Sequence, residues 1–471
     1  MDYQLFNRTR ELILYNNTEI MKRVNLRIIL SLMLIMTCVS NMVALSGRWR
    51  GDIAVGPAKV PLVFNFKVND AGVTEVTLDS PQQNVKDLPA EIKFCEGDSI
   101  AVECKMIGAA YSGKVIGNEI KGTFSQRGFN LPLILSQELP LSERRPQTPV
   151  PPFPYEVKDT VFTSSDGTIL AGTLTIPANS IGKKPTIVVM VTGSGPQNRD
   201  EEIFEHRPFA VIADYLARNG IASFRYDDRG IASSKGDFAK ATINTFKSDA
   251  ESALNFVKTF PEFGKVGILG HSEGGSLASL IASEGKPDFI VSLAGMVISA
   301  KETLIAQNML TLDQWGISGE QKDASLKLIE ILFDTIIDQY NQGISTPIDL
   351  DRLCKDNSIE VPTLVLDSIK HNNAMRSGYF DSLVSLDPTD ALKKIKCPVL
   401  AINGSIDTQV NAEKNLAAFK QYIPTAQIKR MEGLNHMMQH ANTGDTTEYA
   451  EIKETISPEV LQIISDFITK Q

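Results

Sequence analysis

Cysteine, histidine and tryptophan are scarce in this sequence, and their scarcity narrows the chemistry. The 471 residues include five cysteines, five histidines and two tryptophans. No two cysteines form a C-x-x-C pair, so a zinc site is not expected. Long runs of lysine and arginine are also missing, and the formal net charge of -9 disfavours a nucleic-acid partner. A small or uncharged substrate is therefore favoured.

A long hydrophobic run is missing as well, which bears on how the chain begins. Met21-Lys22-Arg23 is followed by an apolar run at residues 28–36 and by small residues up to Ala44. This pattern is typical of a secretory signal, and the run is short for a membrane span. Residues 1–44 are thus predicted to be an upstream extension and a signal peptide. Such a signal directs the protein out of the cytoplasm, to the periplasm or cell envelope.

Alternatives stay open for two of these features. The segment 1–44 is a retained membrane anchor in one alternative. In another, Cys38 is the lipidated cysteine of a lipoprotein, although Thr37 is a poor residue before it. A membrane is expected as a partner only through such a signal or anchor.

Cys95 and Cys104 either form a disulfide in an oxidising compartment or are small buried apolar residues.

The chain is too long for one core, and its 42% hydrophobic and 22% charged residues are ordinary for a soluble globular protein. Residues 47–137 contain short alternating runs, from 60–66 to 131–135, separated by turn residues such as Gly117-Asn118. This pattern predicts a small antiparallel β barrel or sandwich. Residues 138–154 are rich in proline and predict an extended, semi-rigid linker.

Residues 155–471 alternate between predicted strands and helices. This order predicts an α/β domain with a mostly parallel sheet, helices on both faces and chemistry at the carboxyl ends of the strands. From about residue 300 to 392 the alternation stops and helical spacing takes over. We expect this inserted block to be a helical cap over the site.

The stretch Gly270-His271-Ser272-Glu273-Gly274 is the clearest chemical motif. An apolar run precedes it, and apolar residues at helical spacing follow it. The G-x-S-x-G pattern between a strand and a helix is typical of a nucleophile elbow, in which Ser272 is held in a strained turn. The backbone amide of Glu273, at the start of the helix, is then one candidate donor to an oxyanion.

A second candidate donor follows the strand predicted at residues 186–191. Gly193-Ser194-Gly195-Pro196 is a glycine-rich turn at the same edge of the sheet. Such a turn leaves backbone amides free, and that of Ser194 is the best placed of them. The mixed charges of residues 225–230, after the next strand, are expected to tie loops together rather than to act in catalysis.

An acid and a base follow the last strands. Asp407 lies in the loop after a strand at residues 398–403, where a carboxylate can reach an imidazole. His436 is the first histidine after the final strand at residues 428–431, and this order favours it as the general base. Three other histidines are set aside because one is in a predicted early helix, one is on the surface and one points elsewhere on the elbow: His206, His371 and His271. His440 forms an H-x-x-x-H pattern with His436, but without a nearby acidic partner or an HExxH context a metal site is not expected here.

With Ser272, Asp407 and His436 in this order, residues 155–471 resemble the α/β-hydrolase superfamily. Residues 193–200, 225–230 and 433–436 are similar more specifically to bacterial esterases of the serine-aminopeptidase-like group. Thr192 departs from the pattern, because many members carry histidine before the oxyanion glycine. The first domain is similar only in broad pattern to β-rich modules that precede such esterases.

The resemblance implies a serine hydrolase that cleaves carboxylic esters through an acyl-enzyme, without a cofactor or metal. A small ester is the expected substrate and partner. The apolar helical faces of the cap favour short-chain acyl groups, although Asp313 or Glu330 could bind a substrate ammonium. A serine aminopeptidase or a thioesterase would use the same triad, and a non-catalytic binding protein on the same scaffold is a third alternative.

Overall fold

The computed structural model describes residues 45–471 except 56–57, 70, 82–84 and 179–183. The chain divides into two units, Met1–Pro140 and Leu141–Gln471, and each is described by itself. The predicted signal peptide at residues 1–44, including Cys38, lies outside the described residues. In the described part of the chain, no helix has both the length and the apolar character needed to cross a bilayer.

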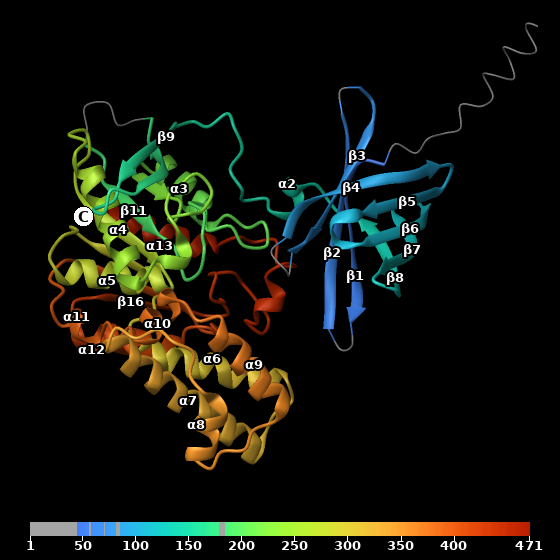
Figure 1. Cartoon of the computed structure of the whole chain (residues 1–471). Coiled ribbons are helices and arrows are strands. Elements are labelled where there is room, and N and C mark those ends of the chain that lie inside the picture. Colours follow the sequence, from blue (N-terminus) through green and yellow to red (C-terminus); the bar gives the residue numbers. More distant parts are fainter. Residues whose placement is uncertain (1–44, 56–57, 70, 82–84, 179–183) are drawn as a thin grey trace, which may run out of the picture. The chain divides into compact units, whose positions relative to one another are not determined.

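The first unit is a closed barrel of eight antiparallel strands in sequence order (Figure 1). Pairing of β1 with β8, with Trp49 opposite Gln137, closes the sheet on itself, so the unit is a barrel and not a sandwich. Its strands are β1 (Gly47–Val55), β2 (Ala58–Val68), β3 (Thr74–Ser80), β4 (Val85–Glu96), β5 (Ser99–Cys104), β6 (Ala109–Ile116), β7 (Glu119–Gln126) and β8 (Phe129–Gln137).

Alternation of side chains fills this barrel. Along β5, Ile100, Val102 and Cys104 are buried and the residues between them are half-buried. The Cys104 thiol donates to the carbonyl oxygen of Pro89, 3.4 Å away, and Cys95 on β4 is also a free thiol. The two cysteines therefore act here as core residues and not as a disulfide.

The second unit is built on a sheet of eight strands in the order β16-β15-β14-β13-β11-β12-β10-β9. The strands from β11 onward run parallel, while β9 and β10 pair antiparallel at one edge. The α/β fold class predicted from the sequence is confirmed. The strands are β9 (Glu156–Thr163), β10 (Ile169–Ile176), β11 (Ile187–Val191), β12 (Ala222–Tyr226), β13 (Val266–His271), β14 (Ile290–Leu293), β15 (Val399–Gly404) and β16 (Gln427–Met431).

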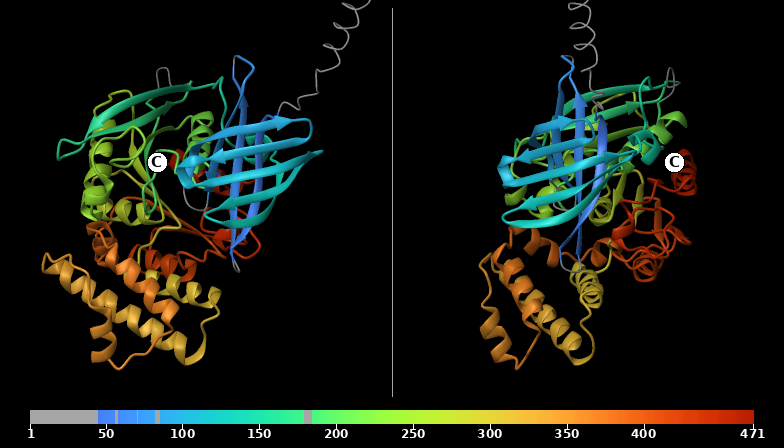
Figure 2. Two further views of the ribbon diagram at one scale, coloured as in Figure 1. Left: turned by 45° about the vertical axis from the view of Figure 1, so that its right-hand side comes forward. Right: turned by 90° about the vertical axis from the view of Figure 1, so that its right-hand side faces the viewer.

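Helices cover both faces of this sheet, because its central strands are apolar on both sides. In β11, Ile187 and Val189 belong to the core under α4 (Ile243–Lys258), α5 (Glu273–Ser283) and α12 (Ala412–Tyr422). The intervening residues Val188 and Met190 belong to the core under α3 (Pro208–Arg218) and α13 (Pro458–Thr469). Figure 2 shows these layers from two further directions.

A block of helices is inserted between β14 and β15, at the position predicted for the cap. It has a hydrophobic cluster of its own, in which Leu328, Leu332 and Ile336 of its longest helix are buried. The helices gather beside the sheet domain in Figure 1. They are α6 (Ala300–Gln314), α7 (Gly319–Asn341), α8 (Leu350–Asp356), α9 (Thr363–Ala374), α10 (Gly378–Val384) and α11 (Thr389–Leu392).

The proline-rich stretch, for which the composition predicts an extended, semi-rigid linker, belongs to the second unit from Leu141 onward. It begins with a short helix, α2 (Leu141–Arg144), and then lies against the rest of the second unit. Arg145 is buried and donates to the backbone carbonyls of Phe204, Ala450 and Ile452. The prolines set the backbone direction, but these hydrogen bonds attach the segment to the rest of the second unit.

We predict that Arg145→Ala lowers the free energy of unfolding of the second unit by about 2–4 kcal/mol, because several buried carbonyls lose a charged donor. Urea unfolding followed by circular dichroism at the helical band reports on this unit, which contains the long helices. Arg352→Ala, at a side chain that is 77% exposed, is the control and should change little. Equal stability of the two variants would contradict the anchoring role.

Candidate active site

Ser272 stands in a tight turn between β13 and α5, as the G-x-S-x-G pattern predicts. Its backbone has φ 53° and ψ -117°, a conformation that a non-glycine residue adopts only where the surrounding structure imposes it. A Cβ on Gly270 would overlap the carbonyl of Gly274, and a Cβ on Gly274 would overlap the carbonyl of Val191. Both positions need glycine because backbone from β13, α5 and β11 meets here.

The turn places Ser272 at the carboxyl end of a central strand of the sheet. The amide of Ser272 donates to the carbonyl oxygen of Leu293 at 2.9 Å, which ties the turn to the end of β14. On the other side, a Cβ on Gly193 would lie 3.3 Å from the Cβ of Ser272. The glycine-rich loop after β11 therefore passes directly beside the serine, as the sequence predicts.

Asp407 and His436 form a buried pair at the same edge. Asp407 follows β15 and His436 follows β16, and His436 Nδ1 donates to Asp407 Oδ2 over 2.8 Å. Asp407 Oδ1 accepts from the amides of Gln409 and Val410, each at 2.8 Å. The Asp407 side chain is fully buried and that of His436 is 5% exposed. With Nδ1 donating, Nε2 of His436 is the ring nitrogen that can accept a proton.

The serine and the imidazole lie in one site without a recorded hydrogen bond. The ring centroids of His436 and His271 are 4.8 Å apart, and His271 immediately precedes Ser272. Within the described residues, no hydrogen bond joins the Ser272 hydroxyl to His436. In unliganded hydrolases this contact is often long and shortens when substrate binds.

The amides of Ser194 and Glu273 are the two predicted oxyanion donors. In the loop after β11, the Gly193 amide donates to Glu201 Oε1 at 2.6 Å and the Gly195 amide to the Tyr379 hydroxyl at 3.0 Å. The Ser194 amide between them has no recorded hydrogen-bond partner among the described residues, and neither has the Glu273 amide at the start of α5. Both N–H groups therefore remain able to bind a ligand oxygen.

The side chain of Glu273 was not singled out by the sequence. Its carboxyl group is 3% exposed and accepts a hydrogen bond from the hydroxyl of Tyr379, on cap helix α10, at 2.6 Å. Burial raises the pKa of Glu273 to about 7, against the lowering effect of its hydrogen bonds with Tyr379 and Ser194. Through Tyr379, which also accepts from the Gly195 amide, the cap is linked to the glycine-rich loop after β11 and to the residue after Ser272.

His271, the residue before Ser272, contacts a hydrogen-bond partner with each of its ring nitrogens. Its Nδ1 lies 2.9 Å from Glu201 Oε1, and its Nε2 lies 3.1 Å from the backbone carbonyl oxygen of His436. Burial favours the neutral ring, but the charge and hydrogen bond of Glu201 outweigh it and raise the pKa of His271. Glu201 thus holds both His271 and the Gly193 amide, and His271 in turn holds the loop of His436.

The remaining histidines lie apart from this pair. His206 precedes α3 instead of belonging to it, and its ring nitrogens contact Thr455 Oγ1 and the carbonyl of Tyr449. His440 is 64% exposed, and the expectation that it lacks an acidic partner is wrong, because its Nδ1 lies 2.9 Å from Glu454 Oε2. His371 is exposed on the cap, as predicted. In the ranges that the structure describes, no three His, Cys, Asp or Glu side chains form a group that could hold a metal ion.

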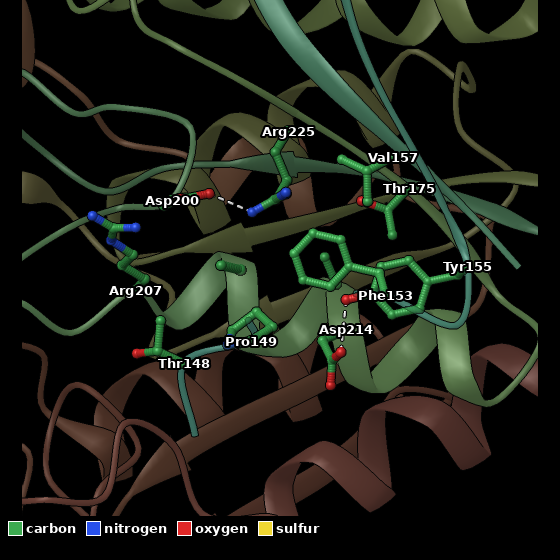
Figure 3. Close-up of a pocket in the computed structure, with 12 residues that line it drawn as sticks. Thr148, Pro149, Phe153, Tyr155, Val157, Thr175, Asp200, Arg207, Asp214 and Arg225 are labelled. Atoms are coloured by element: carbon green, nitrogen blue, oxygen red, sulfur yellow. Dashed lines mark hydrogen bonds and ion pairs between the residues drawn. The ribbon is translucent and has the colours of Figure 1, made fainter. Parts of the chain in front are cut away.

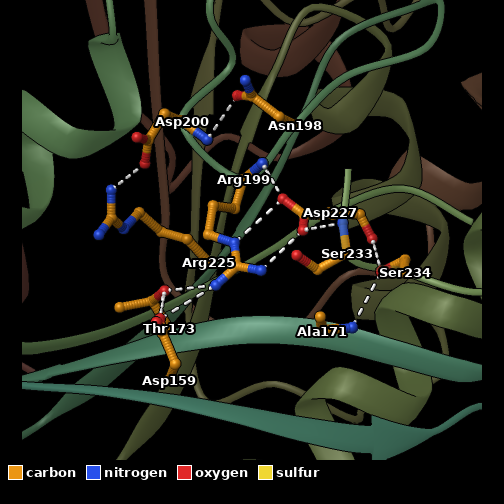
Figure 4. Close-up of polar contacts among 10 residues, drawn as sticks. All are labelled: Asp159, Ala171, Thr173, Asn198, Arg199, Asp200, Arg225, Asp227, Ser233 and Ser234. Atoms are coloured by element: carbon orange, nitrogen blue, oxygen red, sulfur yellow. Dashed lines mark hydrogen bonds and ion pairs between the residues drawn. The ribbon is translucent and has the colours of Figure 1, made fainter. Parts of the chain in front are cut away.

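Charged side chains after β12 tie the loops of the site together, as predicted for residues 225–230. Arg199 donates from Nε and Nη2 to the two carboxylate oxygens of Asp227, at 3.0 and 2.7 Å (Figure 4). Asp228 accepts from the Gln197 amide at 3.0 Å and from the Thr192 hydroxyl at 3.2 Å. These contacts hold the glycine-rich loop after β11 against the end of β12. Thr192, at a position where many α/β-hydrolases carry histidine, is part of this support.

Comparison with known proteins agrees with the fold. The serine aminopeptidase S33 family (Hydrolase_4) matches residues 205–442, just over half of the chain. The protein therefore belongs to this family of α/β hydrolases. The matched region contains the elbow, the cap and the loops of Asp407 and His436.

Three named proteins are similar to parts of this chain. Esterase EstD of Thermotoga maritima is 28% identical over 292 residues, which are 60% of this chain and 63% of that protein. The chain thus spans less than two thirds of the length of this relative. An acyl transferase of Photobacterium phosphoreum is 24% identical over 170 residues, 36% of this chain and 49% of the relative. A solved esterase of Pyrococcus furiosus has 16% identity and a TM-score of 0.42, covering 67% of this chain and 91% of that one.

We predict that Glu273→Gln changes how stability depends on pH. Because the pKa of Glu273 is about 7 in the folded protein and near 4.5 when exposed, folding favours its protonated form. The stabilisation from the protonated Glu273 carboxyl group is complete below the pKa of this group in the unfolded state. It is lost as the pH rises through about 7. The variant cannot ionise, so relative to wild type it should gain on the order of 3 kcal/mol between about pH 5 and pH 8.

Urea unfolding at a series of pH values measures this effect. Glu262→Gln, at an exposed glutamate, is the matched control and should follow the wild-type curve. Parallel pH profiles for wild type and Glu273→Gln would show that the buried carboxyl group does not titrate as described.

Proposed function

We propose that the protein is a serine hydrolase that cleaves carboxylic esters, with Ser272 as nucleophile, His436 as general base and Asp407 as the orienting acid. The observation that carries the proposal is the buried His436–Asp407 hydrogen bond of 2.8 Å at the sheet edge where Ser272 occupies a strained elbow. Membership of the hydrolase family and the similarity to an esterase support the same activity.

The proposed reaction follows from these positions. As Ser272 attacks the ester carbonyl, His436 Nε2 takes the hydroxyl proton and later gives it to the leaving alcohol. Asp407 keeps Nδ1 protonated and stabilises the transient imidazolium. The negative oxygen of the tetrahedral intermediate is stabilised by the amides of Ser194 and Glu273. Water then attacks the acyl-enzyme in the same way and releases the carboxylic acid.

Two other aspartates of this unit, Asp381 and Asp387, form hydrogen bonds with groups other than the His436 imidazole. Asp381, another buried carboxylate of this unit, lies in the cap and is bound by Arg376 at 2.8 Å. Asp387 accepts from the amide of Thr389 at 3.0 Å, in the turn before α11. These contacts leave Asp407 as the carboxylate in contact with the imidazole.

The same reasoning bears on the aminopeptidase alternative, which requires an acceptor for a substrate ammonium. Asp313 pairs with Lys322 at 2.6 Å, and Glu330 lies 3.7 Å from Lys301. The carboxyl group beside the nucleophile, that of Glu273, is buried and bound by Tyr379. The carboxylates suggested by the sequence are thus already paired with lysine. This favours esters over peptides with a free amino terminus.

We predict that Asp407→Asn lowers kcat on a short-chain ester on the order of a thousandfold or more, because an amide no longer stabilises the productive imidazole tautomer. Steady-state kinetics measure the loss. Asp387→Asn is the matched control, since that residue serves only a turn. A near-normal rate in Asp407→Asn would remove Asp407 from the mechanism.

We also predict efficient turnover of acetyl and butyryl esters and poor turnover of alanyl and prolyl anilides. An activated ester needs little help at its leaving group, whereas an amide leaving group must be protonated and its chain positioned. The comparison is kcat/KM for each substrate, with Ser272→Ala as the blank and labelling of Ser272 by a fluorophosphonate as the test of the nucleophile. Equal turnover of the anilides would favour a peptidase, and ester cleavage by Ser272→Ala would reject the proposed nucleophile.

A further inference from the structure

A cavity of about 160 Å³ lies in the second unit, apart from the residues proposed for catalysis. It is bounded by strands β10 and β12, by helix α3 and by the segment from Thr148 to Val157 (Figure 3). A single buried water needs only on the order of 15 Å³ of such space, so a small organic molecule fits here. The sequence had offered no function for this segment beyond linking the two domains.

Two buried polar groups on the sheet side of the cavity lack hydrogen-bond partners among the residues that the structure describes. Arg225 is 8% exposed and its Nε has no hydrogen-bond partner among the described residues. Thr175 is 1% exposed and its hydroxyl has none either. A buried donor without an acceptor is costly, and native proteins seldom leave one unless a ligand or water binds there. Both residues line the cavity.

Four other arginines of this unit show which group the Nε–Nη2 edge of a guanidinium binds. Arg199, Arg218, Arg229 and Arg376 each use Nε and Nη2 together to hold the two oxygens of one aspartate carboxylate. Arg225 contacts Asp200 through Nη1 instead. No residue that the structure describes forms a hydrogen bond with its Nε–Nη2 edge. This edge is the one whose geometry matches a carboxylate.

The aspartates of the cavity do not fill that edge. Asp200 is bound to Nη1 of Arg225, and Asp214 is held by Arg218 and by the Tyr155 hydroxyl at 2.6 Å. A second cation, Arg207, lies on the cavity wall with its Nε paired to Glu202. An incoming anion would therefore find a guanidinium edge while the neighbouring carboxylates keep their own partners.

Apolar side chains of the opposite wall come from the proline-rich segment and α3, which also contribute Thr148 and Asp214 to the lining. Phe153 stacks beside Tyr155 with ring centroids 5.4 Å apart, and Pro149, Ala210 and Ala213 complete the wall. Figure 3 shows the Phe153 ring near the centre of the lining residues and Arg225 at their upper edge. A ligand for this site thus combines a carboxylate at one end with a short apolar or aromatic tail.

We propose that this cavity binds a small monocarboxylate with an apolar tail, its carboxylate on the Nε–Nη2 edge of Arg225 and the hydroxyl of Thr175, and its tail against Phe153. Burial lowers the pKa of Arg225, so the guanidinium gains from an anionic partner in this place. The site is separate from the catalytic one, because neither Ser272 nor His436 lines it.

Isothermal titration with benzoate and butyrate tests the proposal on the full chain. Saturable binding is expected for both acids, and none for benzyl alcohol or butanol, which lack the carboxylate. A carboxylic acid could also occupy the catalytic site, so the titration is repeated after Ser272 has been blocked with a fluorophosphonate. Binding should persist. Failure of the label would count against the proposed esterase mechanism, and the titration on unlabelled protein would still test the cavity.

Three variants assign the binding to the cavity. Arg225→Lys keeps the positive charge beside Asp200 but loses the planar edge, and it should weaken binding on the order of tenfold or more. Thr175→Val removes only an unpartnered hydroxyl, so it should keep the fold and still bind several-fold more weakly. Ser223→Ala is the matched control, because Ser223 lies opposite Thr175 on β12, is also unpartnered and does not line the cavity.

Absence of binding to wild type would overturn the proposal, as would binding that disappears when Ser272 is blocked. Unchanged affinity in Thr175→Val and in a folded Arg225→Lys would also overturn it, because the acid would then bind elsewhere. Should Arg225→Lys fail to fold, the comparison of Thr175→Val with Ser223→Ala decides.

Discussion

The close approach of three backbone segments around Ser272 is the constraint on which the site depends. The turn after β13 touches the start of α5, and α5 touches the end of β11 so closely that neither Gly270 nor Gly274 can carry a side chain. This contact forces the positive φ of Ser272 and directs the first amide of α5 toward the same space. The strain is maintained because the surrounding sheet and helix are fully packed.

Around this turn, loops from distant parts of the chain are joined by charged hydrogen bonds. Glu201 contacts the Gly193 amide and His271, and His271 contacts the backbone of His436. Arg199 and Asp227 hold the far side of the same oxyanion loop. Because these groups are largely buried, loss of one partner would leave an unpaired charge, so the loops are held in one arrangement.

The inserted cap takes part in this arrangement through Tyr379. Tyr379 accepts from the Gly195 amide and donates to the carboxyl group of Glu273, so a helix of the insertion contacts both sides of the proposed oxyanion site. The cap also has its own hydrophobic cluster, which includes Leu328 and Ile336. The cap is thus packed around a cluster of its own, and the Tyr379 contact joins it to the residue that follows Ser272.

Local patterns in the sequence determined the parts of this protein that depend on near neighbours: the elbow at Ser272, the strand-helix alternation, the inserted helices and the turns of the barrel. They missed strand β1, because Gly51 interrupts the alternation of large apolar residues there. Gly51 occupies an inward position where a larger residue would overlap the carbonyl of Ile134. They also missed the partnership of Glu273 with Tyr379 and the unpartnered edge of Arg225. Those features join residues far apart in the chain, and only the tertiary structure decides which buried polar groups meet and which are left without a partner.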